Sequence, residues 1–148
     1  MKSMAKLISL FMIISILGCF SLAVSAAPAN TVYSDLWVNA GGSTYETTTS
    51  ATTATRKTCY MRLRWFKFQY FPDSIMPGGD YIYSRLYTPL HTQASNYASF
   101  SGVTSVGNYN YSYLSGFGGS SQSYVIKSNS SYSLTGYWVK LDWSANPY

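Results

Sequence analysis

Residues that could carry acid–base or nucleophilic chemistry are scarce in this sequence. His91 is the single histidine, and it follows Pro89 and Leu90 in a segment with the composition of a loop. A hydrolytic triad needs a histidine base held between a nucleophile and a carboxylate, and the sequence contains no Gly-x-Ser-x-Gly pattern to mark that nucleophile. We therefore interpret His91 as an exposed loop residue and predict that the protein is not an enzyme.

Cys59 and the acidic residues offer equally little chemistry. Cys59 occupies an apolar position of a strand pattern, which is typical of a small buried hydrophobic residue. A thiol nucleophile paired with His91 is the less favoured alternative. Asp73 and Asp80 flank one loop as the only local candidates for a carboxylate pair, although capping of the loop is the commoner use of Asp there. The sequence predicts no metal site and no cofactor.

Aromatic side chains, by contrast, are abundant, and the 15 tyrosines are the largest group. Exposed Tyr and Trp rings stack on sugars or lie at membrane interfaces, because the ring is apolar while its polar tip stays hydrated. Two rows of tyrosine alternate along expected strands, and we predict that these rows bind ligand if they face solvent. Burial of the rows inside the fold is the alternative. The predicted ligand-binding residues are Tyr81, Tyr83, Tyr109, Tyr111 and Tyr113.

The positive charge of the chain is concentrated in one short stretch. Beyond residue 26, eight Lys and Arg face five Asp and Glu, which leaves a net charge of +3. Five of the eight cations lie between residues 56 and 67, where they are suited to contact acidic lipid or wall polymers. A solvated strand face is the alternative, and nucleic acid is not an expected partner of an exported chain. The predicted anionic-surface contacts are Arg56, Lys57, Arg62, Arg64 and Lys67.

The first 26 residues predict export. Lys2 and Lys6 precede the uncharged apolar run 7–24, and small residues up to Ala26 complete the layout of a secretory signal peptide. We expect a signal helix that is cut after Ala26, leaving residues 27–148 as one secreted, extracellular domain. An uncleaved anchor is an alternative, because the run approaches the length of about 17 residues that spans a bilayer. Lipidation of Cys19, which ends the lipobox-like segment 16–19, is another.

The remaining 122 residues follow β patterns without sustained helical periodicity. Short runs rich in Val, Ile, Tyr, Phe, Trp and Thr alternate with Gly, Pro, Asn and Ser turns, as in a sandwich or barrel. One cysteine there cannot close an intrachain disulfide, so the fold depends on its core. We predict an all-β fold, a single antiparallel β-sandwich of about seven short strands after the signal helix. The expected strands are 31–38, 59–71, 81–87, 108–114, 123–127 and 132–143, with a short one within 92–100.

Three details of the pattern are specific enough to test. Apolar residues occupy alternate positions from Cys59 to Trp65, and then the phase changes to Phe66 and Phe68, which predicts a β-bulge or bend at Trp65-Phe66. The Ser/Thr-rich tract 43–58 has either two exposed strands or a mobile loop. In the last strand, the odd positions are expected to face the core; they are Tyr137, Val139, Leu141 and Trp143.

The order of these segments from Cys59 onward resembles a group of small secreted proteins of Gram-positive bacteria, most of them uncharacterised. The resemblance is carried by the aromatic-rich strand 60–63, the glycine loop 114–119 and the closing segment 133–138. It implies secretion and an all-β fold. It implies no activity and no site residues.

Three functions are consistent with these observations. The favoured one is a non-enzymatic secreted β-sandwich that binds cell-surface or wall glycan through exposed aromatic residues. A membrane-active bacteriocin or pore-forming toxin is the second, because the tract 43–58 resembles segments that unfurl into membranes. A structural extracellular protein that self-associates through strand edges is the third. The oligomeric state stays open.

Overall fold

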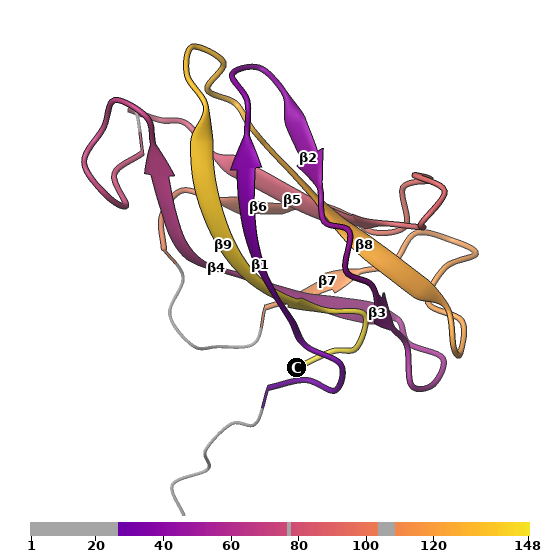
Figure 1. Ribbon diagram of the computed structural model, residues 1–148. Coiled ribbons are helices and arrows are strands. Elements are labelled where there is room, and N and C mark those ends of the chain that lie inside the picture. Colours follow the sequence, from indigo (N-terminus) through magenta and orange to yellow (C-terminus); the bar gives the residue numbers. More distant parts are fainter. Residues whose placement is uncertain (1–26, 77, 104–108) are drawn as a thin grey trace, which may run out of the picture.

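The computed structural model describes residues 27–76, 78–103 and 109–148, and within these ranges it contains nine strands and no helix (Figure 1). The prediction of an all-β fold is confirmed, with nine strands in place of about seven. The predicted signal segment 1–26 lies outside the described residues. The strands are β1 (Val32–Val38), β2 (Ser43–Tyr45), β3 (Ser50–Ala51), β4 (Thr58–Phe68), β5 (Ile82–Tyr87), β6 (Ala98–Phe100), β7 (Asn110–Ser112), β8 (Ser123–Ser130) and β9 (Tyr137–Ser144).

The strands form two antiparallel sheets. One has the order β1-β9-β4-β7, and the other has the order β2-β8-β5-β6, with β3 also paired to β8. In Figure 1, β1 and β9 lie in front of β5 and β8, whose direction crosses theirs. Each sheet therefore has one face turned toward the other sheet and one face turned outward.

The hydrophobic core lies between the inner faces of the two sheets. Alternation along each strand supplies it, since successive side chains point to opposite sides of a sheet. Each such residue contributes about 1.5–3 kcal/mol when it is fully buried. The thiol of Cys59 is part of this core and donates to the carbonyl of Tyr111, so its predicted burial is confirmed. The core also contains all four predicted residues of β9, namely Tyr137, Val139, Leu141 and Trp143.

A β-bulge interrupts the pairing of β4 with β9. The register shifts between Leu63 and Trp65, so Arg64 is the extra residue. Leu63 faces the core before the shift, and Phe66 does so after it. The predicted bulge is confirmed, slightly earlier in the strand than Trp65-Phe66. As a result of the bulge, Arg64 and Trp65 are neighbours in sequence, yet both line the same groove on the outer side of the sheet.

The tract 43–58 forms strands β2 and β3, which confirms the expected number of strands but not their expected exposure. Ser50 is buried there, and its hydroxyl donates to the carbonyl of Asn30 and accepts from the amide of Ala145. The boundary between the last two strands differs from the prediction. Residues 128–130 extend β8 instead of forming a turn, because Ser128 and Asn129 pair with both β2 and β5. Pairing with neighbours thus outweighs the turn-like composition of this segment.

Candidate functional site: two outer sheet faces

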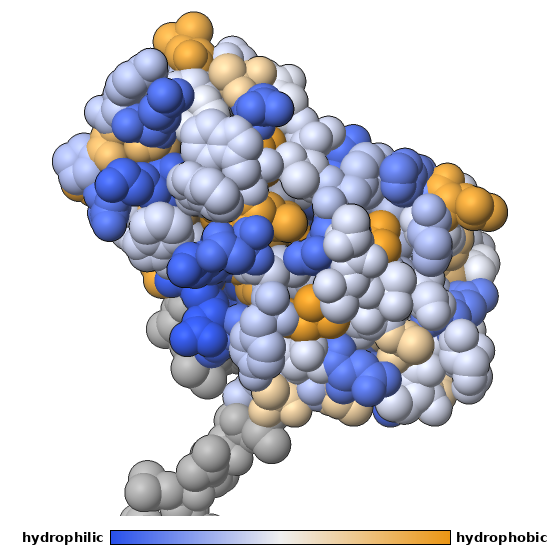
Figure 2. Space-filling model, in the orientation of Figure 1, coloured by the Kyte–Doolittle hydropathy of each residue, from blue (hydrophilic) through white to orange (hydrophobic). Residues whose placement is uncertain are grey.

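The first candidate site is the outer face of the sheet β1-β9-β4. Antiparallel register aligns its outward residues in three rows that cross the strands. Figure 2 shows charged groups mixed with pale aromatic residues over β1 and β9. We call this surface the four-strand face. Its residues are Trp37, Trp138 and Lys67 in one row, Asp35, Lys140 and Trp65 in the next, and Tyr33, Asp142 and Arg62 in the third, with Arg64 beside them.

All charged groups of the four-strand face are ion-paired. Asp142 accepts a hydrogen bond from Arg62 and lies 3.6 Å from Arg64, and its side chain is only 4% exposed. Burial by itself lowers the pKa of Arg62, but the hydrogen bond to Asp142 acts together with the charges of Asp142, Tyr60 and Tyr148, and their sum raises that pKa. Lys140 lies 3.3 Å from Asp35. The remaining cation, Lys67, lies 2.9 Å from Asp73 of the following loop.

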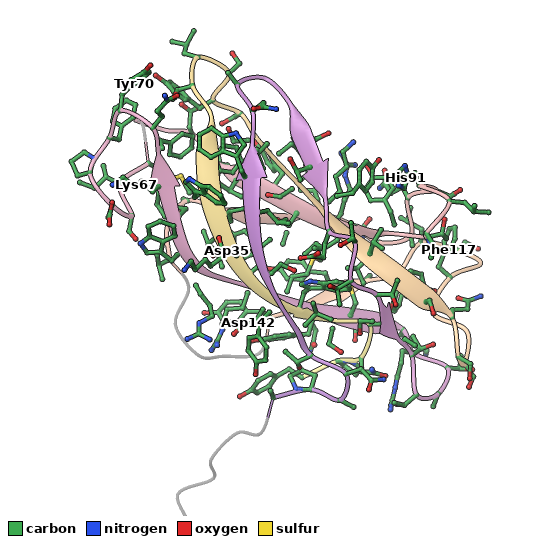
Figure 3. All side chains as sticks on the ribbon, in the orientation of Figure 1. Asp35, Lys67, Tyr70, His91, Phe117 and Asp142 are labelled. Atoms are coloured by element: carbon green, nitrogen blue, oxygen red, sulfur yellow. The ribbon has the colours of Figure 1, made fainter. Side chains whose placement is uncertain are left out.

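An open groove of about 390 Å³ crosses the four-strand face. Tyr33 is one of its aromatic residues and is 66% exposed, while the Trp65 ring lies 5.4 Å from the ammonium of Lys140. Figure 3 shows Asp35 and Asp142 on neighbouring strands of this face. The groove therefore combines ring surfaces with paired charges that donate and accept hydrogen bonds. It is lined by Tyr33, Ser34, Asp35, Arg64, Trp65, Lys140, Leu141 and Asp142.

Two tryptophans lie at the end of the four-strand face beyond the groove. The rings of Trp37 and Trp138 are 5.3 Å apart and tilted by 55°. The indole of Trp37 donates to Asn39 at 3.0 Å, which holds the ring in place. Gly136 allows this packing, because a Cβ atom at that position would overlap the Trp37 ring. Trp138 keeps part of its ring exposed to solvent.

The second candidate site is the outer face of the sheet β2-β8-β5. Lys127 lies at its centre, directly opposite Tyr45 on one side and Arg85 on the other. Aromatic rings surround these residues: Tyr45 contacts Tyr87 edge-on at 5.2 Å, and Tyr83 contacts Tyr97 edge-on at 5.5 Å. We call this surface the five-strand face. Its residues are Tyr45, Tyr83, Arg85, Tyr87, Tyr97 and Lys127.

The two predicted tyrosine rows lie in different environments. Tyr81 is exposed and Tyr83 is half-buried, and their rings are 6.2 Å apart at the five-strand face. Tyr111 and Tyr113 instead pack against the core. The hydroxyl of Tyr113 donates to the carbonyl of Ala145, and burial raises its pKa.

The row with Tyr81 and Tyr83 therefore lies near solvent, whereas the row with Tyr111 and Tyr113 has less ring surface free. Tyr109 is half-buried, with its carbonyl accepting a bond from the amide of Met61. Ligand binding by all five predicted tyrosines stays a prediction.

The predicted cationic stretch divides into two parts. Arg62, Arg64 and Lys67 belong to the four-strand face, where each is paired with an acid. Arg56 and Lys57 precede β4, and the guanidinium of Arg56 donates to the hydroxyl of Thr53. Because two carboxylates, Asp142 and Asp73, pair with three of the five cations, the stretch does not form a uniform positive patch. Its contact with anionic surfaces stays a prediction.

The residues considered for catalysis do not converge. His91 is exposed, as predicted, and its ring stacks 4.0 Å from that of Tyr45, while Cys59 is enclosed in the core. Burial raises the pKa of Cys59 to about 12. Asp73 contacts Lys67, whereas Asp80 accepts a hydrogen bond from Ser131. Within the described ranges, no three His, Cys, Asp or Glu side chains group as metal ligands do.

Sequence reasoning missed most residues of both faces. A usable signal existed for the four-strand face, since Tyr33, Asp35 and Trp37 alternate along β1. The even positions of β9 supply the rest of that signal. No sequence pattern indicated that Arg85 and Lys127 are neighbours. The two residues are distant in sequence and meet only because β5 pairs with β8.

Comparison with known proteins gives no family assignment. No protein-family model matches the chain, and no curated protein matches it. In the described part of the chain, none of the segments is a helix of the length and apolarity needed to span a bilayer.

Proposed function

We propose that this chain is an exported, non-enzymatic β-sandwich protein that binds glycan of a cell surface or wall through the groove of the four-strand face. The observation that carries the proposal is the combination of Tyr33 and Trp65 with paired charges in one open groove. A sugar ring has an apolar C–H face that suits an aromatic ring. Its hydroxyl groups both donate and accept, so they suit a carboxylate placed beside a cation.

The charge of the groove favours an uncharged glycan. Two carboxylates and two cations line it, and contacts between them already satisfy much of their charge. An acidic sugar would have to compete with Asp35 for Lys140. A neutral sugar only adds hydrogen bonds to the existing pair. Binding sites of this kind place a few polar groups among ring surfaces to fix the orientation of the ligand.

The proposal is tested by removing the most exposed ring of the groove. In calorimetric titration with purified neutral wall polysaccharides, Tyr33→Ala is expected to raise the Kd about fivefold, since an aromatic contact contributes about 1 kcal/mol. Tyr70→Ala is the matched control, because Tyr70 is 77% exposed and lies outside the groove. If the unaltered protein binds none of these polysaccharides, or if both variants lose affinity equally, the proposal is wrong.

A second candidate function, contact with a membrane, is favoured by exposed apolar side chains on two adjacent loops. Tyr70 and Ile75 lie on the loop after β4, and Leu134 lies on the loop before β9. A backbone hydrogen bond from Gln69 to Gly136 joins the loops. The test is dye release from anionic vesicles, with Leu134→Ser expected to reduce it. Vesicles that stay sealed with the unaltered protein would remove this candidate.

Self-association is favoured by one feature of the fold. Strand β1 lies at an edge of its sheet and spans seven residues, and long exposed edges pair readily with other chains. Size-exclusion chromatography at increasing concentration tests it. A protein that elutes as a monomer throughout would contradict this function.

A further inference from the structure

Two positive charges lie side by side on the five-strand face. Arg85 and Lys127 are direct partners in the pairing of β5 with β8, and their side chains extend from the same side of the sheet. The Cβ atoms of such partners are about 4.5–5.5 Å apart, so two like charges destabilise the sheet there. Both residues are half-buried, which limits the relief that solvent provides. This arrangement calls for a compensating negative charge.

The protein itself does not supply that charge. The sequence contains five acidic residues, all in the described ranges, and each accepts hydrogen bonds or pairs with a cation elsewhere. The partners are Lys140 for Asp35, Lys67 for Asp73, Arg62 and Arg64 for Asp142, Ser131 for Asp80, and Thr47 and Thr48 for Glu46. Arg85 and Lys127 thus have no ion pair within the described part of the chain.

Aromatic rings and one unused donor complete the site. The ammonium of Lys127 lies 5.0 Å from the ring centre of Tyr45 and 5.3 Å from that of Tyr87. The guanidinium of Arg85 donates to Gln93 through Nη1, while its buried Nε has no hydrogen-bond partner among the described residues. Rings around a charge exclude water, which strengthens attraction to an incoming anion.

We propose that Arg85 and Lys127 bind an oxyanion group, phosphate, sulfate or carboxylate, carried by an acidic saccharide. The guanidinium supplies directed donors and the ammonium a point charge, which is the usual division between these side chains. Tyr97 is 55% exposed beside Arg85, with its ring centre 5.8 Å from the guanidinium, so it offers a surface for the sugar ring. The site is separate from the groove of the four-strand face and does not depend on it.

A saccharide suits this surface better than a lipid headgroup does. The aliphatic side chain on this side of β8, Val125 opposite Tyr87, is buried, so the described surface has rings to stack on a sugar but no exposed aliphatic group to enter acyl chains. The exposed apolar loop residues Ile75 and Leu134 lie outside it, and the exposed Leu90, next to His91, lines a separate pocket with Phe117. The two positive charges favour an acidic group on the ligand, and the aromatic rings favour a sugar as the molecule that carries this group.

The experiment compares four ligands by calorimetric titration of the full mature chain: heparin oligosaccharides, uncharged dextran of matched length, inorganic phosphate, and vesicles containing phosphatidylglycerol. We expect heparin oligosaccharides to bind, dextran not to bind at this site, and phosphate to bind more weakly than heparin. Arg85→Gln and Lys127→Gln should each raise the Kd for heparin oligosaccharides about tenfold or more, because each removes a charge-assisted contact. Tyr97→Ala should weaken binding of the saccharide and leave phosphate binding unchanged.

Two variants serve as controls. Lys57→Gln removes an exposed cation of the predicted anionic-surface stretch 56–67, which lies outside the five-strand face. An unchanged Kd in this variant is expected if heparin binds Arg85 and Lys127 and not that stretch. Lys127→Arg keeps the charge and should retain binding, which separates loss of charge from loss of folding. Tyr33→Ala should also leave heparin affinity unchanged, so the groove and this site can fail independently.

The proposal is overturned by any of three results. One is equal heparin affinity in the unaltered protein and in Lys127→Gln. Another is equal loss of affinity in Lys57→Gln, which would indicate attraction to net charge or to the stretch 56–67 instead of this site. The third is binding to the vesicles with no binding to the saccharide, which would identify a lipid headgroup as the ligand.

Discussion

The two outer faces of this sandwich use the same strand geometry but differ in how their charges are compensated. On the four-strand face, Arg62, Arg64, Lys67 and Lys140 each contact a carboxylate. On the five-strand face, Arg85 lies opposite Lys127 with no acid beside either residue in the described structure. The difference teaches that cross-strand register, rather than charge composition, decides whether a cation stabilises the fold or stays available to a ligand.

The largest effect is expected from the buried ion pair of the four-strand face. Asp142→Asn leaves Arg62 partly buried without its counter-charge, which should lower the free energy of unfolding by about 3 kcal/mol. Urea denaturation measures this loss. Asp35→Asn is the matched control, because its pair with Lys140 is exposed and should cost less than about 1 kcal/mol. Similar losses in the two variants would mean that burial does not distinguish these pairs.

The next effect concerns the core that both faces share. Burial raises the pKa of Cys59 from 9.0 to about 12, so above pH 9 the unfolded chain loses this proton while the folded chain keeps it. Stability is therefore retained below pH 9 and falls by up to about 1.4 kcal/mol per pH unit as the pH rises toward 12.

Urea midpoints across this alkaline range test the effect, and Cys59→Ala should show a shallower decline. The slope of the decline is compared rather than the absolute stability, because Cys59→Ala also removes buried volume. An identical slope in the two proteins would show that the thiol does not contribute, and the raised pKa values of buried tyrosines such as Tyr137 would then account for the decline.

The smallest effect tests the contrast between the faces through salt. Raising the ionic strength from low to about 0.5 M should weaken heparin binding at the five-strand face about tenfold, because unpaired charges attract the ligand through solvent. Binding of neutral polysaccharide at the groove should change less than twofold over the same range. Equal salt dependence of the two affinities would contradict the assignment of different ligands to the two faces.

Much of the fold was predictable from local pattern. The alternation of Val139, Leu141 and Trp143 indicated the inner side of β9, and the phase change after Leu63 indicated the bulge. Both follow from the two-residue period of a strand, which is a property of the local chain. The extension of β8 through Ser128 and Asn129 was missed, because those residues form a strand only through their partners on β2 and β5.

The candidate sites were less predictable than the fold. The sequence left open whether either tyrosine row faces solvent. Tyr81 is exposed and Tyr83 half-buried, whereas Tyr111 and Tyr113 pack against the core, and their alternation gave no indication of this difference. Period-two patterns identify which residues share a side of a strand. They do not identify which side of the strand is buried in the core, because tyrosine, serine and asparagine can occupy a buried side or an exposed one.

The sequence by itself determined the all-β character of the described part of the chain, the inward side of the central strand β9 and the shortage of groups for acid–base catalysis. The tertiary structure alone decided that Asp142 is buried in an ion pair with Arg62, and that Arg85 lies opposite Lys127 with no carboxylate paired to either among the described residues. The physical reason is that backbone hydrogen bonds join strands without regard to side-chain identity. Which side chains become neighbours is then set by the packing of the whole molecule.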